Sequence, residues 1–144
     1  MTGILAGKVA LITGSGRGMG QAHAVLLAEN GADVIVHDIV AERVAETAAL
    51  VRSKGRQALE AVVDVADAQA MAHLVERAEK TLGRIDILVN NAGIGADRAV
   101  VEDIDEAMYD RMFGIHVRGS FFTTRAVVPG MRRRKSGVRR CFRC

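Results

Sequence analysis

The residues with the clearest chemical meaning lie at positions 11–20, which read LITGSGRGMG and follow a short apolar run. The glycines fit neither G-x-G-x-x-G nor a Walker P-loop, because the third glycine of the first and the Lys-Ser or Lys-Thr of the second are missing. What remains is G-x-x-x-G-x-G, formed by Gly14, Gly18 and Gly20, with Gly16 incidental to the pattern. Glycines at a strand-to-helix turn let N–H groups close on a phosphate. We therefore predict a pyrophosphate-binding turn, the alternative being a purely structural turn.

An acidic residue follows at the distance that a dinucleotide-binding fold requires. Asp38 ends the next apolar run, 20 residues after Gly18. At that point a carboxylate accepts hydrogen bonds from the hydroxyls of the adenosine ribose and repels the extra phosphate of NADP. NAD is therefore the favoured cofactor, and Arg17 in the turn adds some tolerance for a phosphate. The alternative is that Asp38 only caps the following helix.

Amide and small residues end the fourth apolar run. In the strand order 3-2-1-4, the first and fourth strands are neighbours, and the crevice at their carboxyl ends is where such folds bind ligands. Asn90, Asn91 and Gly93 fall there, where they can approach a ribose and tie adjacent loops together. Ordinary turn chemistry is the alternative.

Alternating apolar runs and helical periodicities predict the elements that position these residues. Strands are expected over residues 8–13, 33–37, 58–63 and 85–89. Helices are expected from the glycine turn to residue 30 and over 41–54, 71–82, 105–117 and 120–131. Strands that alternate with helices of this length indicate an α/β fold, a Rossmann-like doubly wound parallel sheet of about four strands.

Helical spacing also predicts which residues of two helices face the core. On the first helix, the apolar residues that share one face are Met19, Ala22, Leu26 and Leu27. On the third, the clearest in the chain, they are Met71, Leu74, Val75, Ala78 and Leu82.

Composition and charge narrow the class of protein. A chain of 144 residues with 49% hydrophobic content suits one domain with a real core. No apolar window has the length of a membrane span and no signal-like start is present, so we expect a soluble cytoplasmic protein.

The net charge of +3 is unevenly distributed along the chain, because residues 132–144 hold seven of the 20 basic residues and no acid. Both cysteines also lie there, which excludes a disulfide framework for the body, and the histidine spacing indicates no metal site.

Taken together, these residues resemble the short-chain dehydrogenase/reductase family, of the type that includes 3-oxoacyl-carrier-protein reductases. The segment 13–20 is similar to the family's glycine motif, residues 90–93 to its second signature, and residues 109–131 to its fifth helix. The resemblance covers about residues 5–137. It implies that Asp64 and the amide of Val65 hold the adenine ring. The full set of implied cofactor-binding residues is Gly14, Ser15, Arg17, Gly18, Met19, Gly20, Asp38, Asp64, Val65, Asn90, Asn91 and Gly93.

The resemblance further implies hydride transfer between a nicotinamide and a small carbonyl or alcohol substrate, by a chain that forms homo-oligomers. What the resemblance implies is general acid–base catalysis by a tyrosine, whose pKa is lowered by a lysine four residues later, while a serine polarises the substrate oxygen. Here the only tyrosine is Tyr109, with Phe113 four residues on, so no catalytic residue is identified. His116 stands where the family has a relay asparagine, and it is either a replacement for that residue or a packing residue.

The last residues depart from the family. We interpret residues 1–137 as the N-terminal part of a dinucleotide-binding domain. Residues 138–144 are interpreted as a basic, cysteine-containing tail outside the native fold, of the kind that a shift of the reading frame would produce. The serine-bearing fifth strand is then expected to be absent, leaving the fourth strand as an apolar edge that favours self-association. The arginines and the C-x-x-C spacing of Cys141 and Cys144 are weak signals, so we expect neither a nucleic acid nor a membrane as partner.

Two functions follow from these observations. The first is an NAD(H)-dependent oxidoreductase, present as a fragment that keeps the cofactor site and lacks the catalytic Ser and Tyr-x-x-x-Lys. The second is a non-catalytic NAD-binding or partner-binding module.

Overall fold

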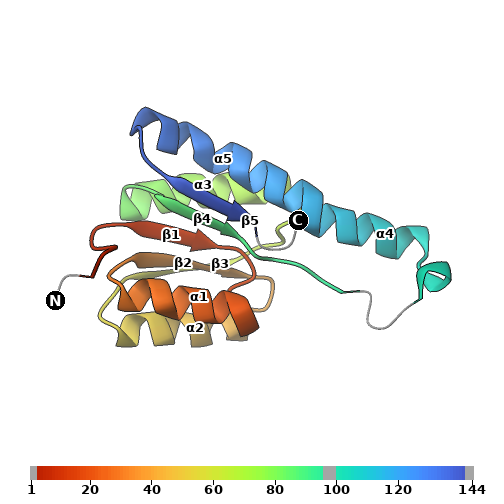
Figure 1. Ribbon diagram of the computed structural model, residues 1–144, viewed down its shortest axis with the longest axis horizontal. Helices are drawn as coiled ribbons and strands as arrows, with labels where there is room; N and C mark the ends of the chain where they lie inside the picture. The colour runs from red at the N-terminus through yellow and green to blue at the C-terminus, as the bar shows by residue number, and fades with distance from the viewer. Residues whose placement is uncertain (1–2, 96–99, 142–144) are drawn as a thin grey trace.

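The computed structural model describes residues 3–95 and 100–141 of the chain. A parallel sheet has the order β3-β2-β1-β4-β5, with α1 and α2 on one face and α3 and α5 on the other (Figure 1). The strands are β1 (Val9–Ile12), β2 (Asp33–Asp38), β3 (Ala58–Val62), β4 (Ile87–Asn90) and β5 (Val138–Cys141). The helices are α1 (Gly18–Glu29), α2 (Ala41–Ser53), α3 (Ala68–Leu82), α4 (Glu106–Phe113) and α5 (Ser120–Arg133). The predicted doubly wound, Rossmann-like parallel sheet is confirmed.

Alternate residues of the central strand build two cores. Val9 and Leu11 of β1 face the α3 and α5 side, whereas Ala10 and Ile12 face the α1 and α2 side, as the period of two in a strand requires. Parallel strands that are covered on both faces read as continuous apolar runs, and β1 is buried along its whole length. Helix α3 contributes the face that its spacing predicts, with Met71, Leu74, Val75 and Ala78 buried.

Helix α1 turns a different face to the sheet from the one its large residues predict. Gly20, Ala24 and Ala28 are buried, whereas Met19 and Leu26 are 49% and 55% exposed. The helix is apolar nearly all round, so spacing alone does not select a face. The small residues face the sheet because they let the helix axis lie close to β1. The prediction is wrong for Met19, Ala22 and Leu26, which are exposed, whereas Leu27 is partly buried and packs against the core.

A fifth strand forms where none was expected. β5 pairs in parallel with β4, from Ile87 opposite Val138 to Asn90 opposite Cys141, and the Val138 N–H donates to the Asp86 carbonyl at 2.8 Å. The ladder bonds join main-chain groups, so the arginine side chains of this segment do not prevent pairing. β4 is therefore an inner strand, and the prediction that it is an exposed apolar edge is wrong. Residues 138–141, which the sequence analysis assigns to a tail, pair with β4 in the sheet.

The two helices predicted over 105–117 and 120–131 form one continuous helical rod. Gly114–Gly119, a π-helical segment, joins α4 to α5, and α4 projects beyond the sheet (Figure 1). Gly119 allows this rod to lie against the loop after β3, because a Cβ on it would be 3.0 Å from the Val65 carbonyl oxygen. The rod carries residues from a distant part of the sequence to the carboxyl ends of the strands.

A buried carboxylate fastens the start of β4 to the start of β1. Asp86 Oδ2 accepts the Val9 N–H at 3.0 Å and the Arg84 Nε–H at 2.7 Å. Burial of Asp86 opposes its ionisation, but these hydrogen bonds outweigh it and hold the pKa of the carboxyl below its usual 3.8. No helix within residues 3–95 and 100–141 has the length and apolar content to cross a lipid bilayer.

Candidate functional site

A cavity of about 550 Å³ opens at the carboxyl ends of β1, β2, β3 and β4. Its volume lies within the range of small-molecule and cofactor sites. Ten of the twelve residues predicted to bind cofactor line it, and they are Gly14, Arg17, Gly18, Met19, Gly20, Asp38, Asp64, Val65, Asn91 and Gly93.

The glycine turn has a shape that larger residues do not fit. Gly14 and Gly18 have left-handed φ angles of +64° and +56°. A Cβ on Gly14 would be 2.8 Å from Ala92 Cα, and one on Gly20 would be 2.2 Å from the Gly14 carbonyl oxygen. A Cβ on Gly18 would meet no described atom within 4 Å, so this side of its main chain faces open space, and its left-handed φ is what favours glycine here. This cradle, which side chains would fill, fits a phosphate group bound to main-chain N–H groups.

Gly16 does not line the cavity but holds Asp38 beside it, so the prediction that it is incidental is wrong. Its N–H donates to Asp38 Oδ2 at 3.1 Å, and its carbonyl accepts the Thr47 hydroxyl at 3.3 Å. A Cβ at this position would lie 2.7 Å from both Asp38 Oδ2 and Arg43 Cβ. Glycine is needed here because α2 and β2 come close to this residue. The spacing of the glycines along the sequence does not reveal that contact.

Asp38 lies beside the glycine turn and lines the cavity with it. It is 8% exposed, and its other oxygen, Oδ1, accepts the Val40 N–H at 3.2 Å, one residue before α2 begins. Both the predicted role beside the turn and the alternative role near the helix start are thus compatible with its position. Each carboxylate oxygen keeps acceptor capacity beyond these bonds.

His37 is a buried imidazole under the glycine turn. Its Nδ1 accepts the Gly14 N–H at 3.2 Å, and the side chain is withdrawn from solvent. Burial lowers the pKa of His37 from 6.5 to about 4, although the neighbouring carboxylate of Asp38 favours the protonated form. The ring is therefore neutral near pH 7.

Asn91 ties β4 to the same turn. Its N–H donates to Thr13 Oγ1, and its Nδ2 donates to the carbonyl oxygens of Thr13 and Gly14, each at 3.0 Å. Its Oδ1 is buried with no hydrogen-bond partner in the described part of the chain. Asn91 therefore acts on the turn directly, and it also lines the cavity.

Two predicted residues, Ser15 and Asn90, lie outside the wall of this cavity. Ser15 is buried and its Oγ accepts the His37 N–H at 2.9 Å, so its side chain joins the turn to β2. Asn90 faces the opposite side of β4 and donates from Nδ2 to Thr124 Oγ1 at 3.0 Å. The period of two along a strand sends the neighbouring side chains of Asn90 and Asn91 to different sides of the sheet. Cofactor binding by Ser15 and Asn90 stays a prediction.

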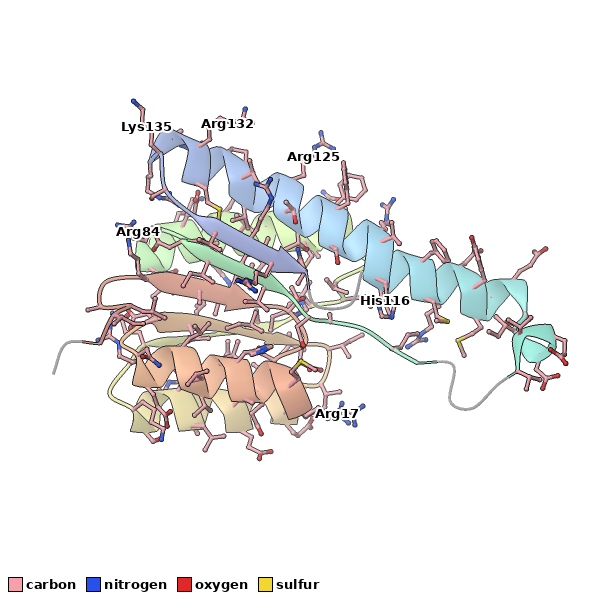
Figure 2. The ribbon with its side chains drawn as sticks, in the orientation of Figure 1. Arg17, Arg84, His116, Arg125, Arg132 and Lys135 are labelled. Atoms are coloured by element: carbon pink, nitrogen blue, oxygen red, sulfur yellow. The ribbon has the colours of Figure 1, made fainter. Side chains whose placement is uncertain are left out.

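Asn90 instead lines a second cavity, of about 940 Å³, between α5 and β5. Five arginines border it, and Arg125 and Arg132 project from the outer side of α5 (Figure 2). The arginines in the wall are Arg125, Arg132, Arg133, Arg139 and Arg140.

Asp64 and Val65 stand at the far end of the first cavity. Asp64 is exposed, and its Oδ1 accepts the Ala66 N–H at 2.9 Å, while Val65 is 7% exposed. The carboxylate thus lies at the surface of the cavity with the apolar side chain of Val65 beside it.

His116 lies in the π-helical segment, where the helical rod passes the segment after β4 (Figure 2). Its Nε2 is 2.8 Å from the Ile94 carbonyl oxygen and 3.2 Å from the Ile94 nitrogen. His116 is half-buried, and it connects the rod with the loop that borders the cavity. Single π-helical turns within longer helices are frequent at functional sites.

The cavity wall also contains residues that the sequence did not reveal. They are His37, Ile39, Arg43, Val63, Ala66, Ala92, Ile94, Asp110, Arg111, Gly114 and Ile115. Most of these residues are sequence neighbours of predicted residues at the strand ends. Asp110 and Ile115, by contrast, are brought to the cavity by the helical rod. Within the described ranges, no three His, Cys, Asp or Glu side chains come together as metal ligands.

Comparison with known proteins places this chain in a family. The model of a family described as short chain dehydrogenase matches residues 8–138. The chain belongs to the short-chain dehydrogenase family. It is 38% identical over 135 residues to (−)-trans-carveol dehydrogenase of Rhodococcus erythropolis, which covers 85% of this chain and 49% of that protein. The chain spans about half the length of the curated relatives it matches.

Solved structures agree with this assignment. Carveol dehydrogenase of Mycobacterium avium in complex with NAD superposes with a TM-score of 0.91 and 38% identity, covering 97% of this chain and 55% of that one. A metagenomic short-chain oxidoreductase in complex with NADP has a TM-score of 0.89 and 29% identity, covering 95% and 62%. The family thus comprises oxidoreductases that bind nicotinamide cofactors, either NAD or NADP.

Proposed function

We propose that this chain is the cofactor-binding portion of an NAD(H)-dependent oxidoreductase that transfers hydride between the nicotinamide and a carbonyl or alcohol substrate. The observation that carries the proposal is Asp38, held by the Gly16 N–H at 3.1 Å at the edge of a cavity whose other wall is the glycine turn. A carboxylate beside a phosphate-binding turn is the arrangement that recognises an adenosine ribose.

The cavity supports a division of roles along its length. The main chain of the turn at Gly18 would hold the pyrophosphate, whereas Gly14, whose N–H is held by His37, would shape the turn. Asp38 would hold the ribose hydroxyls. Asp64 and the amide of Val65 would hold the adenine ring at the far end. When bound, the nicotinamide supplies the hydride chemistry, and the protein groups orient the cofactor.

NAD is proposed over NADP because of charge. A phosphate on the adenosine ribose would lie next to the Asp38 carboxylate, which is almost fully buried and therefore poorly screened. Arg17 and Arg43 also line the cavity and reduce this repulsion. The proposal is therefore a preference for NAD over NADP rather than exclusion of NADP.

Turnover is not expected from the 144-residue chain by itself. Its only tyrosine, Tyr109, is followed four residues later by Phe113, with which it stacks at 4.3 Å between ring centroids. A lysine at that spacing is what the proposed acid–base chemistry needs. This observation favours the second candidate, an NAD-binding or partner-binding module without turnover, for the chain as it stands.

Calorimetric titration of the 144-residue chain tests the proposal. We expect saturable binding of NAD and of ADP-ribose, weaker binding of NADP, and no oxidation of NADH in the presence of ketones and aldehydes. Absence of NAD binding would refute the cofactor site, and measurable carbonyl reduction would refute the inactive chain.

We also propose that the chain associates with itself through the helical rod. Tyr109, Phe113, Val117 and Phe121 follow one another at intervals of four residues and are 48% to 61% exposed. We call these four residues the apolar stripe. A continuous exposed apolar stripe on a rod is a typical contact surface.

The cytoplasmic location stays a prediction.

A further inference from the structure

The end of β2 holds three successive residues of the glycine turn. His37 Nδ1 accepts the Gly14 N–H at 3.2 Å, and the His37 carbonyl accepts the Ser15 N–H at 2.7 Å. Asp38 Oδ2 then accepts the Gly16 N–H at 3.1 Å. Every N–H from Gly14 to Gly16 is thus accepted by the end of β2, two by a side chain and one by the main chain, and the Ser15 hydroxyl accepts the His37 N–H in return.

The His37 side chain is suited to this contact because it is a neutral acceptor. An imidazole whose Nδ1 accepts a hydrogen bond carries its proton on Nε2. The groups that favour protonation are the carboxylates of Asp38 and Asp64 and the carbonyls of His37 and Val63, and burial outweighs them. Nδ1 therefore stays available to Gly14 near neutral pH.

Gly14 needs such a partner more than other residues do. Glycine has the widest conformational freedom of all residues, and here it holds a left-handed φ of +64°. Its N–H is partly buried, so losing its acceptor would leave a donor unsatisfied and the turn free to change shape. A turn that is already in its bound shape binds ligand without the cost of ordering.

We propose that His37 is a positioning residue of the dinucleotide site, whose Nδ1 fixes the glycine turn in the conformation that receives the pyrophosphate. The proposal rests on the proposed function of the cavity. His37 acts through Gly14, so it affects the part of the ligand that contacts the turn. Ligands with a pyrophosphate depend on it, whereas adenosine, which would contact Asp38 and Asp64, does not.

Two substitutions in the full 144-residue chain separate positioning from packing. His37→Asn keeps an oxygen acceptor near the position of Nδ1, and His37→Leu keeps apolar bulk without an acceptor. We expect His37→Leu to weaken NAD and ADP-ribose binding about tenfold, the effect of one lost hydrogen bond. His37→Asn should retain most of the affinity, and adenosine should bind all three proteins equally well.

Other outcomes overturn the proposal. A residue needed only for packing would make His37→Leu the better binder, or would weaken adenosine along with ADP-ribose. If the unsubstituted chain binds no NAD, the proposed function fails instead. Should either variant not fold, ¹⁵N NMR of the imidazole in the unsubstituted chain still decides, because a ring protonated on Nδ1 at pH 7 cannot accept the Gly14 N–H.

Discussion

At the scale of single residues, Asp38 is the group that sets the proposed preference between cofactors. Asp38→Asn keeps an oxygen for the Gly16 N–H and removes the charge. We expect NADP affinity to rise about tenfold relative to NAD, because about 1.4 kcal/mol of repulsion suffices for that change. Calorimetry with both cofactors measures the ratio.

The matched control for this substitution is Asp64→Asn, which neutralises the exposed carboxylate at the other end of the cavity. The ratio of the two affinities should stay unchanged in this variant. An equal shift in both variants would show that net charge, and not the position of Asp38, sets the preference.

Gly16 gives a second prediction, for stability. In Gly16→Ala the new Cβ would fall 2.7 Å from Asp38 Oδ2 and Arg43 Cβ, so one of these groups must move. We expect a loss of about 1 to 3 kcal/mol in the free energy of unfolding, typical of overpacking. Gly114→Ala is the control, because its Cβ would meet only Ala66 Cβ at an ordinary 3.8 Å. Urea denaturation measures both, and equal stabilities would contradict the prediction.

The sequence predicted those site residues that act through their own backbone or stand at a strand end. Gly14, Gly18 and Asp38 belong to this group, since turn and strand follow directly from the local pattern. Gly16 and His37 could not be assigned, because their importance lies in contacts between β2 and the turn. To a reader of the sequence, His37 is one more residue of an apolar strand.

At the scale of elements, two buried titratable groups make the sheet sensitive to acid. The pKa of His37 is lowered to about 4 and that of Asp86 lies below its usual value, so both groups take up protons more readily in the unfolded chain. We expect the free energy of unfolding to fall as pH drops from 6.5 to 4, by up to about 3 kcal/mol through His37. Below about pH 4 the loss of charge on Asp86 adds to it.

Urea titrations at a series of pH values test this dependence. His37→Asn should flatten the upper part of the profile, and Asp86→Asn the lower part. A chain whose stability rises on acidification through this range would contradict the assignment of both groups.

Side-chain patterns predicted elements well where one face differs clearly from the other, as in α3. They failed for α1, whose apolar residues surround the helix, so that close approach of Gly20, Ala24 and Ala28 decided its orientation. They failed again for β5, because main-chain pairing with β4 does not depend on the pattern of its side chains.

At the scale of the whole molecule, the exposed surfaces differ in their tendency to associate. β5 is the outer strand next to β4, and pairing of two copies through this strand would bring the like charges of exposed Arg139 and Arg140 together, which pairing with β4 does not. The apolar stripe carries no such protection. We therefore expect copies of the chain to meet through the helical rod rather than through the sheet.

Sedimentation velocity tests this expectation. Replacing Phe113 and Phe121 by Glu should yield a monomer at concentrations where the unsubstituted chain associates, because two charges would be buried in the contact. Leu26→Glu is the control, since Leu26 is an exposed apolar residue of α1 on the other face of the sheet. A monomeric unsubstituted chain, or a loss of association in the control, would contradict the prediction.

The strand order has a consequence for how the chain is made. β1 lies at the centre of the sheet, with β2 on one side and β4 on the other. Ala10 of β1 pairs with Ile87 of β4, so the second edge of β1 stays open until β4 joins the sheet. In a nascent chain, β1, β2 and β3 with α1 and α2 leave the ribosome before Ile87 does, so they can begin to assemble without β4. The centre of the finished sheet is thus the open edge of the growing one, where a chaperone or another nascent chain can bind.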